Sequence, residues 1–237
     1  MHIGILQTGA APDALRPDHG DYPDAFERLL AAEGFRFTTW RVEEMEFPPG
    51  IDAADGWLIT GSRHGAYEDH PFIRPLEAFI RAALGAGVPV VGICFGHQIM
   101  AQAMGGRVER FAGGWAVGPT RYDFGGETLT LNAWHRDQVV AVPPGAEVIA
   151  ENPRCAVAGL VYGTTGFSVQ AHPELSNAFI DGLMRTRGPG LVPDDLMAEA
   201  RARMTAEPDS PPLARRIGDF FRAAHARRAP VAEAAHG

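Results

Sequence analysis

The sequence predicts an α/β fold in which a mostly parallel sheet carries helices on both faces. Short apolar runs alternate with longer amphipathic stretches over the first part of the chain, which is the pattern of a sheet with crossover helices. The hydrophobic content of 46% over 237 residues suffices for a substantial core and argues against a disordered chain. One apolar run ends in Gly-x-Cys-x-Gly and passes directly into a helical pattern, which predicts a sharp strand-to-helix turn.

The first elements follow in regular order. Apolar runs predict strands at residues 2–7, 35–41, 56–60 and 88–93. Apolar residues at helical spacing predict helices at 22–33, 72–84 and 96–104.

From about residue 107 the pattern changes to short runs separated by Gly, Pro and Asn. These runs predict further strands, several of them antiparallel, at 117–122, 128–133, 147–150, 156–162 and 167–170. A helix is expected at 177–187, and two amphipathic helices are expected within 191–228, separated by a Pro-rich break at 208–212.

The predicted domain covers residues 1–190, with a helical extension at 191–228 and a flexible tail at 229–237. The last helix carries an apolar stripe, which predicts docking on the main domain; a partner surface is the alternative. The stripe consists of Leu213, Ile217, Phe220, Phe221 and Ala224.

Composition excludes several classes of function. The net charge of −8 argues against a nucleic-acid partner. All 21 basic residues are Arg, so a Walker-A lysine, a Schiff base and a Ser-x-x-Lys pair are excluded. Two cysteines make no disulfide framework, and the N-terminus resembles a strand rather than a leader; we therefore expect a cytoplasmic protein without a membrane segment.

Cys94 is the first candidate catalytic residue. Gly92 and Gly96 flank it and allow a tight turn, and the first amides of the following helix favour the thiolate. The alternative is an inert buried cysteine, since cysteine is among the most buried residue types. Its place between strand and helix favours a nucleophile.

A cysteine nucleophile needs a base and an acceptor that orients the base. His172 and Glu174 follow a strand, with Pro173 between them, and residues i and i+2 of an extended chain point to the same side. The pair could also be a solvated turn. Together with Cys94, it is better explained as a catalytic base and its carboxylate.

A third strand ends in Thr60-Gly61-Ser62, which places a bare amide at the carboxyl edge of the sheet. We expect the amides of Gly61 and Phe95 to form an oxyanion hole. A simple turn glycine is the alternative.

These residues together resemble a known family. Residues 92–98 (GICFGHQ) resemble the G-x-C-x-G-x-Q signature of class I glutamine amidotransferase domains. Residues 170–174 (QAHPE) are similar to the element that carries their His and Glu, and residues 134–139 (WHRDQV) look like their S-H-x-D-x-V segment. The similarity runs from the first strand to about Arg187.

The resemblance implies the flavodoxin-like sheet of the class I amidotransferases and a triad of Cys94, His172 and Glu174. It implies that Gln98, with backbone near Trp134 and His135, holds the amino-acid end of glutamine. The implied reaction releases glutamate and ammonia from glutamine through a γ-glutamyl thioester, without a cofactor or a metal. A separate synthetase subunit is a possible partner, and the oligomeric state is open.

The chain also departs from that family. Thr60-Gly61-Ser62 stands where many members have Gly-Gly-Pro, and Trp134 replaces a small residue. The Ser-Gly-Gly-x-Asp-Ser loop of the fused synthetases is absent from the sequence. Stand-alone γ-glutamyl peptidases, which share the fold and triad, are similar too, so hydrolysis of γ-glutamyl peptides is an alternative. A regulatory or binding protein on the same scaffold is a third.

Other residues with reactive side chains have a structural explanation. His64 and His70 have no matching ligand set at usable spacing, so a solvated loop is expected there. Cys155 is expected to be structural, and Arg136 and Asp137 are expected in a surface turn or in contact with site residues.

Overall fold

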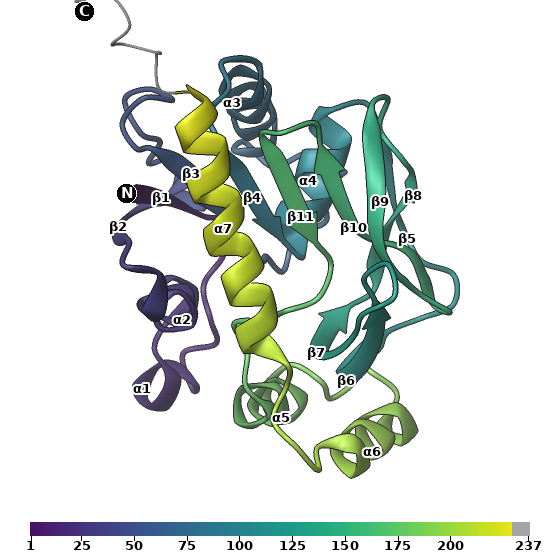
Figure 1. Ribbon diagram of the computed structural model, residues 1–237. Coiled ribbons are helices and arrows are strands. Elements are labelled where there is room, and N and C mark those ends of the chain that lie inside the picture. The colour runs from purple at the N-terminus through teal and green to yellow at the C-terminus, as the bar shows by residue number, and fades with distance from the viewer. Residues whose placement is uncertain (229–237) are drawn as a thin grey trace, which may run out of the picture.

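A nine-stranded mixed sheet forms the centre of the protein in the computed structural model, which describes residues 1–228 (Figure 1). The strand order is β2-β1-β3-β4-β11-β10-β9-β6-β7. The first five of these strands run parallel, as expected from the alternating apolar runs. Their bounds are β1 His2–Gln7, β2 Arg36–Arg41, β3 Gly56–Ile59, β4 Val90–Ile93 and β11 Gly166–Val169.

The other side of the sheet is antiparallel, because its strands are joined by short turns. It contains β6 Ala116–Asp123, β7 Thr128–His135, β9 Ala146–Asn152 and β10 Cys155–Tyr162. A separate two-stranded ribbon pairs β5 Arg107–Arg110 with β8 Asp137–Ala141. Neither ribbon strand was predicted from the sequence; β5 is mostly exposed and polar and has no apolar run.

Helices cover both faces of the sheet, as predicted. One face buries apolar residues of α3 and α4, and the other buries residues of α2 and α7 (Figure 1). The helices are α1 Arg16–His19, α2 Tyr22–Leu29, α3 Ile73–Gly85, α4 Phe95–Ala103, α5 Asn177–Thr186, α6 Asp194–Arg203 and α7 Ser210–Arg228, with short 3₁₀ turns η1 Ala31–Glu33 and η2 Val42–Glu44.

Helix α2 ends earlier than its sequence pattern indicates. Asp21 begins it with a capping box in which Asp24 closes the reciprocal bond. The chain then tightens into η1 and stops at Gly34, which has a left-handed φ of 71°. The predicted helix at 22–33 is therefore an α-helix followed by a 3₁₀ turn. Helix α1 was not predicted, because its four residues include no buried one.

The apolar stripe of α7 packs against the sheet. Leu213, Ile217 and Phe221 are fully buried in the same cluster as Ile3 of β1 and Leu58 of β3. Figure 1 shows α7 in front of the sheet, near β3 and β4. The division at residue 190 stays a prediction, and the tail predicted at 229–237 lies outside the described residues.

Among residues 1–228, none of the helices combines the length and apolar character needed to cross a bilayer.

Candidate active site

Cys94 lies on the turn between β4 and α4. Its φ of 55° and ψ of −102° are unusual for a residue with a side chain, and such backbone strain is typical of functional turns. Its amide donates to the Val169 carbonyl of β11 at 2.9 Å, which ties the turn to the neighbouring strand. The side chain is buried but lines a cavity.

Two glycines let α4 approach the sheet at this turn. A Cβ atom on Gly92 would stand 2.4 Å from the Gly96 carbonyl oxygen, and one on Gly96 would stand 2.4 Å from the Ile59 carbonyl oxygen. Real Cβ atoms do not come that close to backbone oxygens. The close approach expected from Gly-x-Cys-x-Gly is therefore present.

His172 and Glu174 follow β11, whose carboxyl end lies beside that of β4. The His172 Nδ1–H donates to Glu174 Oε1 at 2.7 Å, and both side chains are nearly or fully buried. The His172 amide donates to the Asn132 carbonyl of β7 at 2.8 Å, which fixes the segment against the antiparallel strands. The structure thus places the imidazole and the carboxylate side by side.

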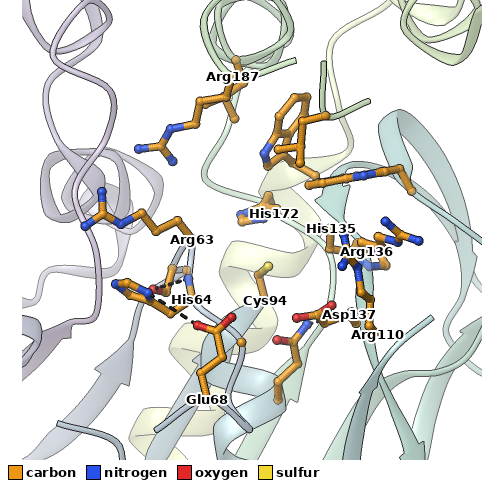
Figure 2. Close-up of a pocket in the computed structure, with 18 of the residues that line it drawn as sticks. Arg63, His64, Glu68, Cys94, Arg110, His135, Arg136, Asp137, His172 and Arg187 are labelled. Atoms are coloured by element: carbon orange, nitrogen blue, oxygen red, sulfur yellow. Dashed lines mark hydrogen bonds and ion pairs between the residues drawn. The ribbon is translucent and has the colours of Figure 1, made fainter. Parts of the chain in front are cut away.

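The second ring nitrogen of His172 is free to face the thiol. Its Nε2 is buried without a hydrogen-bond partner among residues 1–228. Figure 2 shows the Cys94 sulfur pointing toward the His172 ring. Burial lowers the pKa of His172, but the charges of Cys94 and Glu174 outweigh it and raise that pKa well above the ordinary value. This arrangement can hold an imidazolium beside a thiolate.

Gly61 and Phe95 both lie next to Cys94. A Cβ atom on Gly61 would stand 3.1 Å from the Cε1 atom of His172 and 3.9 Å from the Cβ atom of Cys94. Phe95 is the first residue of α4, so its amide has no intrahelical partner. The structure therefore brings together the two backbone segments that the sequence analysis selected.

Gln98 is held in place on one side. Its Nε2 donates to the Asp137 carbonyl at 2.8 Å and to Gln170 Oε1 at 3.1 Å, which uses both amide hydrogens. The Gln170 Nε2 in turn contacts the Cys94 sulfur at 3.6 Å. Gln98 also lines the cavity.

Trp134 and His135 line the same cavity from β7. The Trp134 ring packs against Trp115 at a centroid distance of 5.6 Å. Burial and the nearby His172 lower the pKa of His135 to about 3, so this imidazole is neutral. Both of its ring nitrogens lack a partner within the described part of the chain.

The cavity that contains Cys94 has a volume of about 290 Å³. Four of the residues lining it are arginines, Arg63, Arg110, Arg136 and Arg187, and Figure 2 shows them around Cys94 and His172. Two carboxylates, Glu68 and Asp137, line it as well, so arginines outnumber acidic residues in a small recess that suits an anionic or zwitterionic ligand.

Three supporting residues of the site were not predicted from the sequence. Asn132 donates through Nδ2 to the Leu175 carbonyl at 2.9 Å and so holds the His172 segment from both ends. Gln170 joins Gln98 to Cys94, and its place two residues before His172 was the only available signal. Tyr22 lines the cavity from α2, and burial raises its pKa to about 12.

The remaining candidates are also placed. Burial raises the pKa of the Cys155 thiol to about 12, which fits a structural role at the start of β10. Asp137 lines the cavity and supports Gln98 through its carbonyl. His64 and His70 lie in the segment between β3 and α3, where Glu68 joins them.

Comparison with known proteins places this site in a family. The family model for class-I glutamine amidotransferases matches residues 24–181, which contain Cys94, His172 and Glu174. The chain belongs to the class I glutamine amidotransferase family. Its fold agrees with a solved glutamine amidotransferase from Methylobacillus flagellatus, with a TM-score of 0.71 at 22% identity over 100% of this chain and 98% of that one.

The family members that resemble this chain differ in how much of their length it covers. Gamma-glutamyl peptidase 4 of Arabidopsis thaliana is 30% identical over 82% of this chain and 85% of its own length. The glutamine-hydrolysing GMP synthase of Burkholderia cenocepacia is 36% identical over 51% of this chain but over only 24% of its own length. This class I amidotransferase domain is therefore matched over most of its length by the peptidase.

Proposed function

We propose that this protein hydrolyses the side-chain amide of glutamine, or of a related γ-glutamyl compound, through a thioester on Cys94. The observation that carries the proposal is the buried His172–Glu174 pair beside the Cys94 sulfur at the wall of one cavity. Membership of the class I amidotransferase family supports it.

In the proposed reaction the Cys94 thiolate attacks the γ-carbonyl carbon. The amides of Gly61 and Phe95 donate to the resulting oxyanion. The His172 imidazolium protonates the leaving nitrogen as the C–N bond breaks, so ammonia or an amine departs and a γ-glutamyl thioester remains. The neutral imidazole then takes a proton from water, whose oxygen attacks the thioester carbonyl carbon. The C–S bond breaks, which releases glutamate and restores the Cys94 thiolate beside the His172 imidazolium.

Glu174 serves His172 throughout this cycle. Its carboxylate accepts the Nδ1 proton, which directs Nε2 toward the sulfur and stabilises the imidazolium. Gln98, Trp134 and His135 are proposed to hold the amino-acid end of the substrate, with the Gln98 side-chain oxygen accepting from the ammonium group. The cavity volume is in the range of a small ligand.

A γ-glutamyl peptidase is the second candidate. Two observations favour it: the match to gamma-glutamyl peptidase 4 over 85% of that protein, and the arginines lining the cavity. When a γ-glutamyl dipeptide is cleaved, the leaving amino acid carries a carboxylate, and a guanidinium can bind a carboxylate with two parallel hydrogen bonds. The leaving group of glutamine is ammonia, which carries no carboxylate.

Two further possibilities remain within the same family. The GMP synthase relative supports a subunit that passes ammonia to a separate synthetase. A binding or regulatory protein would use the scaffold without turnover.

One assay separates these proposed functions. It measures glutamate release by the purified protein from glutamine and from a set of γ-glutamyl dipeptides. Turnover of dipeptides without a partner supports the peptidase. Turnover of glutamine that needs cell extract supports the amidotransferase subunit. No release from any substrate, with Cys94 still reactive toward iodoacetamide, would overturn the proposed hydrolysis and favour the binding protein.

A further inference from the structure

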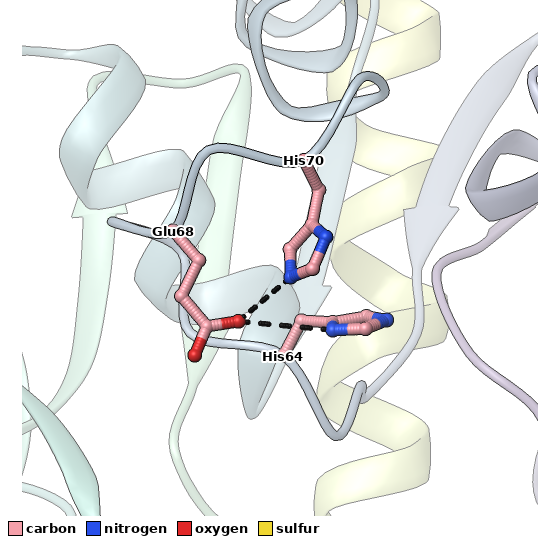
Figure 3. Close-up of side chains that lie close together, drawn as sticks. All are labelled: His64, Glu68 and His70. Carbon is pink, nitrogen blue, oxygen red and sulfur yellow. Dashed lines mark hydrogen bonds and ion pairs between the residues drawn. The ribbon is translucent and has the colours of Figure 1, made fainter.

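Three side chains with metal-binding atoms meet in the segment between β3 and α3. His64, Glu68 and His70 each offer one ligand atom, and these atoms all lie within 4.8 Å of one another. Glu68 Oε2 is 2.8 Å from His70 Nε2 and 3.7 Å from His64 Nδ1 (Figure 3). The sequence suggested no third ligand for the two histidines, and the structure provides one in Glu68.

The two separations from Glu68 are close to those around a tetrahedral ion. Zinc binds His nitrogen and carboxylate oxygen at about 2.0–2.1 Å, which puts two tetrahedral ligands roughly 3.3 Å apart. The two separations from Glu68 Oε2, 2.8 and 3.7 Å, lie on either side of that value. Two histidines and one carboxylate leave a fourth position open, as in a site that retains water.

A second carboxylate orients one of the histidines from a different element. Glu43 of η2 contacts His64 Nε2 through Oε1 at 2.9 Å, on the side of the ring away from Glu68. A carboxylate on the outer nitrogen of a metal-binding histidine fixes its tautomer and leaves the inner nitrogen as the ligand. The His64 amide also donates to Ser62 Oγ at 3.1 Å, which anchors the same segment.

The three side chains are reachable from solvent. The side chains of His64, Glu68 and His70 are 17%, 44% and 35% exposed, so an ion can enter without unfolding the segment. His64 and Glu68 also line the cavity that contains Cys94.

We propose that His64, Glu68 and His70 bind one divalent transition-metal ion of the zinc type on the wall of the Cys94 cavity. The competing explanation is that Glu68 merely forms hydrogen bonds and ion pairs with the two imidazoles. The two explanations involve the same atoms. Only the metal site predicts ion binding that is lost without His64 or His70 and weakened without the carboxylate of Glu43.

Equilibrium dialysis of tag-free protein against ZnCl₂ tests the proposal. The Cys94→Ala background removes the thiol as a competing ligand. We expect one zinc ion per chain, and we expect His70→Ala and His64→Ala each to abolish that stoichiometric binding. His2→Ala is the matched control, since it removes a histidine that contacts Thr38 outside the segment, and it is expected to bind as before.

Two further measurements keep the test independent of folding. Glu43→Gln, with all three ligands intact, is expected to weaken zinc binding by about 10- to 100-fold. Cobalt(II) bound to the Cys94→Ala protein is expected to show the visible absorption of a tetrahedral site, and His70→Ala is expected to lose it while retaining the near-ultraviolet circular dichroism of the parent. Absence of bound zinc, or zinc binding that survives both histidine substitutions, would overturn the proposal.

Discussion

The buried carboxylate of Glu174 acts in the proposed reaction through its hydrogen bond to His172. Its Oε1 accepts the His172 Nδ1–H at 2.7 Å, whereas its Oε2 is buried without a partner among the described residues. A buried carboxylate is costly unless it is paired, so the imidazolium is the form of His172 that best compensates it. Together with the charge of Cys94, this pairing explains why the pKa of His172 is raised despite its burial.

Glu174→Gln is expected to shift the alkaline limb of the pH–rate profile to lower pH. The carboxylate and Cys94 together hold the pKa of His172 above its ordinary value, against the effect of burial. Without that negative charge the imidazolium loses its proton at lower pH, and the general acid for the leaving amine is lost earlier. The rate at the optimum should fall by about 10²-fold or more.

The profile of kcat/KM against pH for glutamate release measures this shift. Glu207→Gln, at an exposed position before α7, is the charge-matched control and should leave the profile unchanged. An alkaline limb at the same pH in Glu174→Gln would show that the carboxylate does not control His172.

Helix α4 packs closely against strands β3 and β4 because two of the contacting residues are glycines. Gly92 and Gly96 bring the backbone of α4 against β4 and β3, and this contact sets the direction in which Cys94 leaves the sheet. The first turn of α4 then stands directly behind the thiol, where its amides and its dipole act on a negative charge.

Gly96→Ala is expected to destabilise the fold by at least about 1–3 kcal/mol, because its Cβ would stand 2.4 Å from the Ile59 carbonyl oxygen and the backbone must move. Gly85→Ala is the matched control. Gly85 ends α3, has open space around its Cβ position and should change stability by no more than about 1 kcal/mol. Urea unfolding measures both; equal effects would contradict the close contact described here.

The elements most readily predicted were those with an apolar face. The parallel strands and helices α3 and α5 were expected within a few residues of their observed bounds, because burial on one or both faces leaves a regular apolar pattern. Strand β5 exposes three of its four residues, so its pairing with β8 is carried by backbone hydrogen bonds that no sequence pattern reveals.

At the scale of the whole molecule, α7 packs the end of the described chain against the first strands of the sheet. Phe221 is fully buried, packs edge-on against Phe35 and would be contacted by a Cβ on Gly56 at 2.9 Å. The helix therefore completes the core on one face of the sheet, the face opposite α3 and α4.

Phe221→Ala is expected to lower the free energy of unfolding by about 3–5 kcal/mol, since it removes a fully buried ring from the cluster under the sheet. Arg215→Ala, on an exposed position of the same helix, should change it by less than about 0.5 kcal/mol. A loss below about 1 kcal/mol in Phe221→Ala, measured by urea unfolding, would mean that α7 is not part of the core.

The candidate site was predictable where its residues form local patterns. Cys94 and the His172–Glu174 pair stand in short motifs at the ends of adjacent strands, and parallel strands bring their carboxyl ends to one edge. Asn132 and Tyr22 could not be found in this way, since they reach the site from β7 and α2 through packing of distant segments. The cluster at Glu68 likewise depends on how one loop folds back on itself.

The central claim, that Cys94 is the nucleophile, is tested most directly by comparing glutamate release from the two single-cysteine variants. Cys94→Ala and Cys155→Ala each remove one buried thiol, and only the first lines the cavity. We expect Cys155→Ala to retain the rate of the unaltered protein and Cys94→Ala to lose it by about 10³-fold or more. Unchanged glutamate release from correctly folded Cys94→Ala would contradict the account.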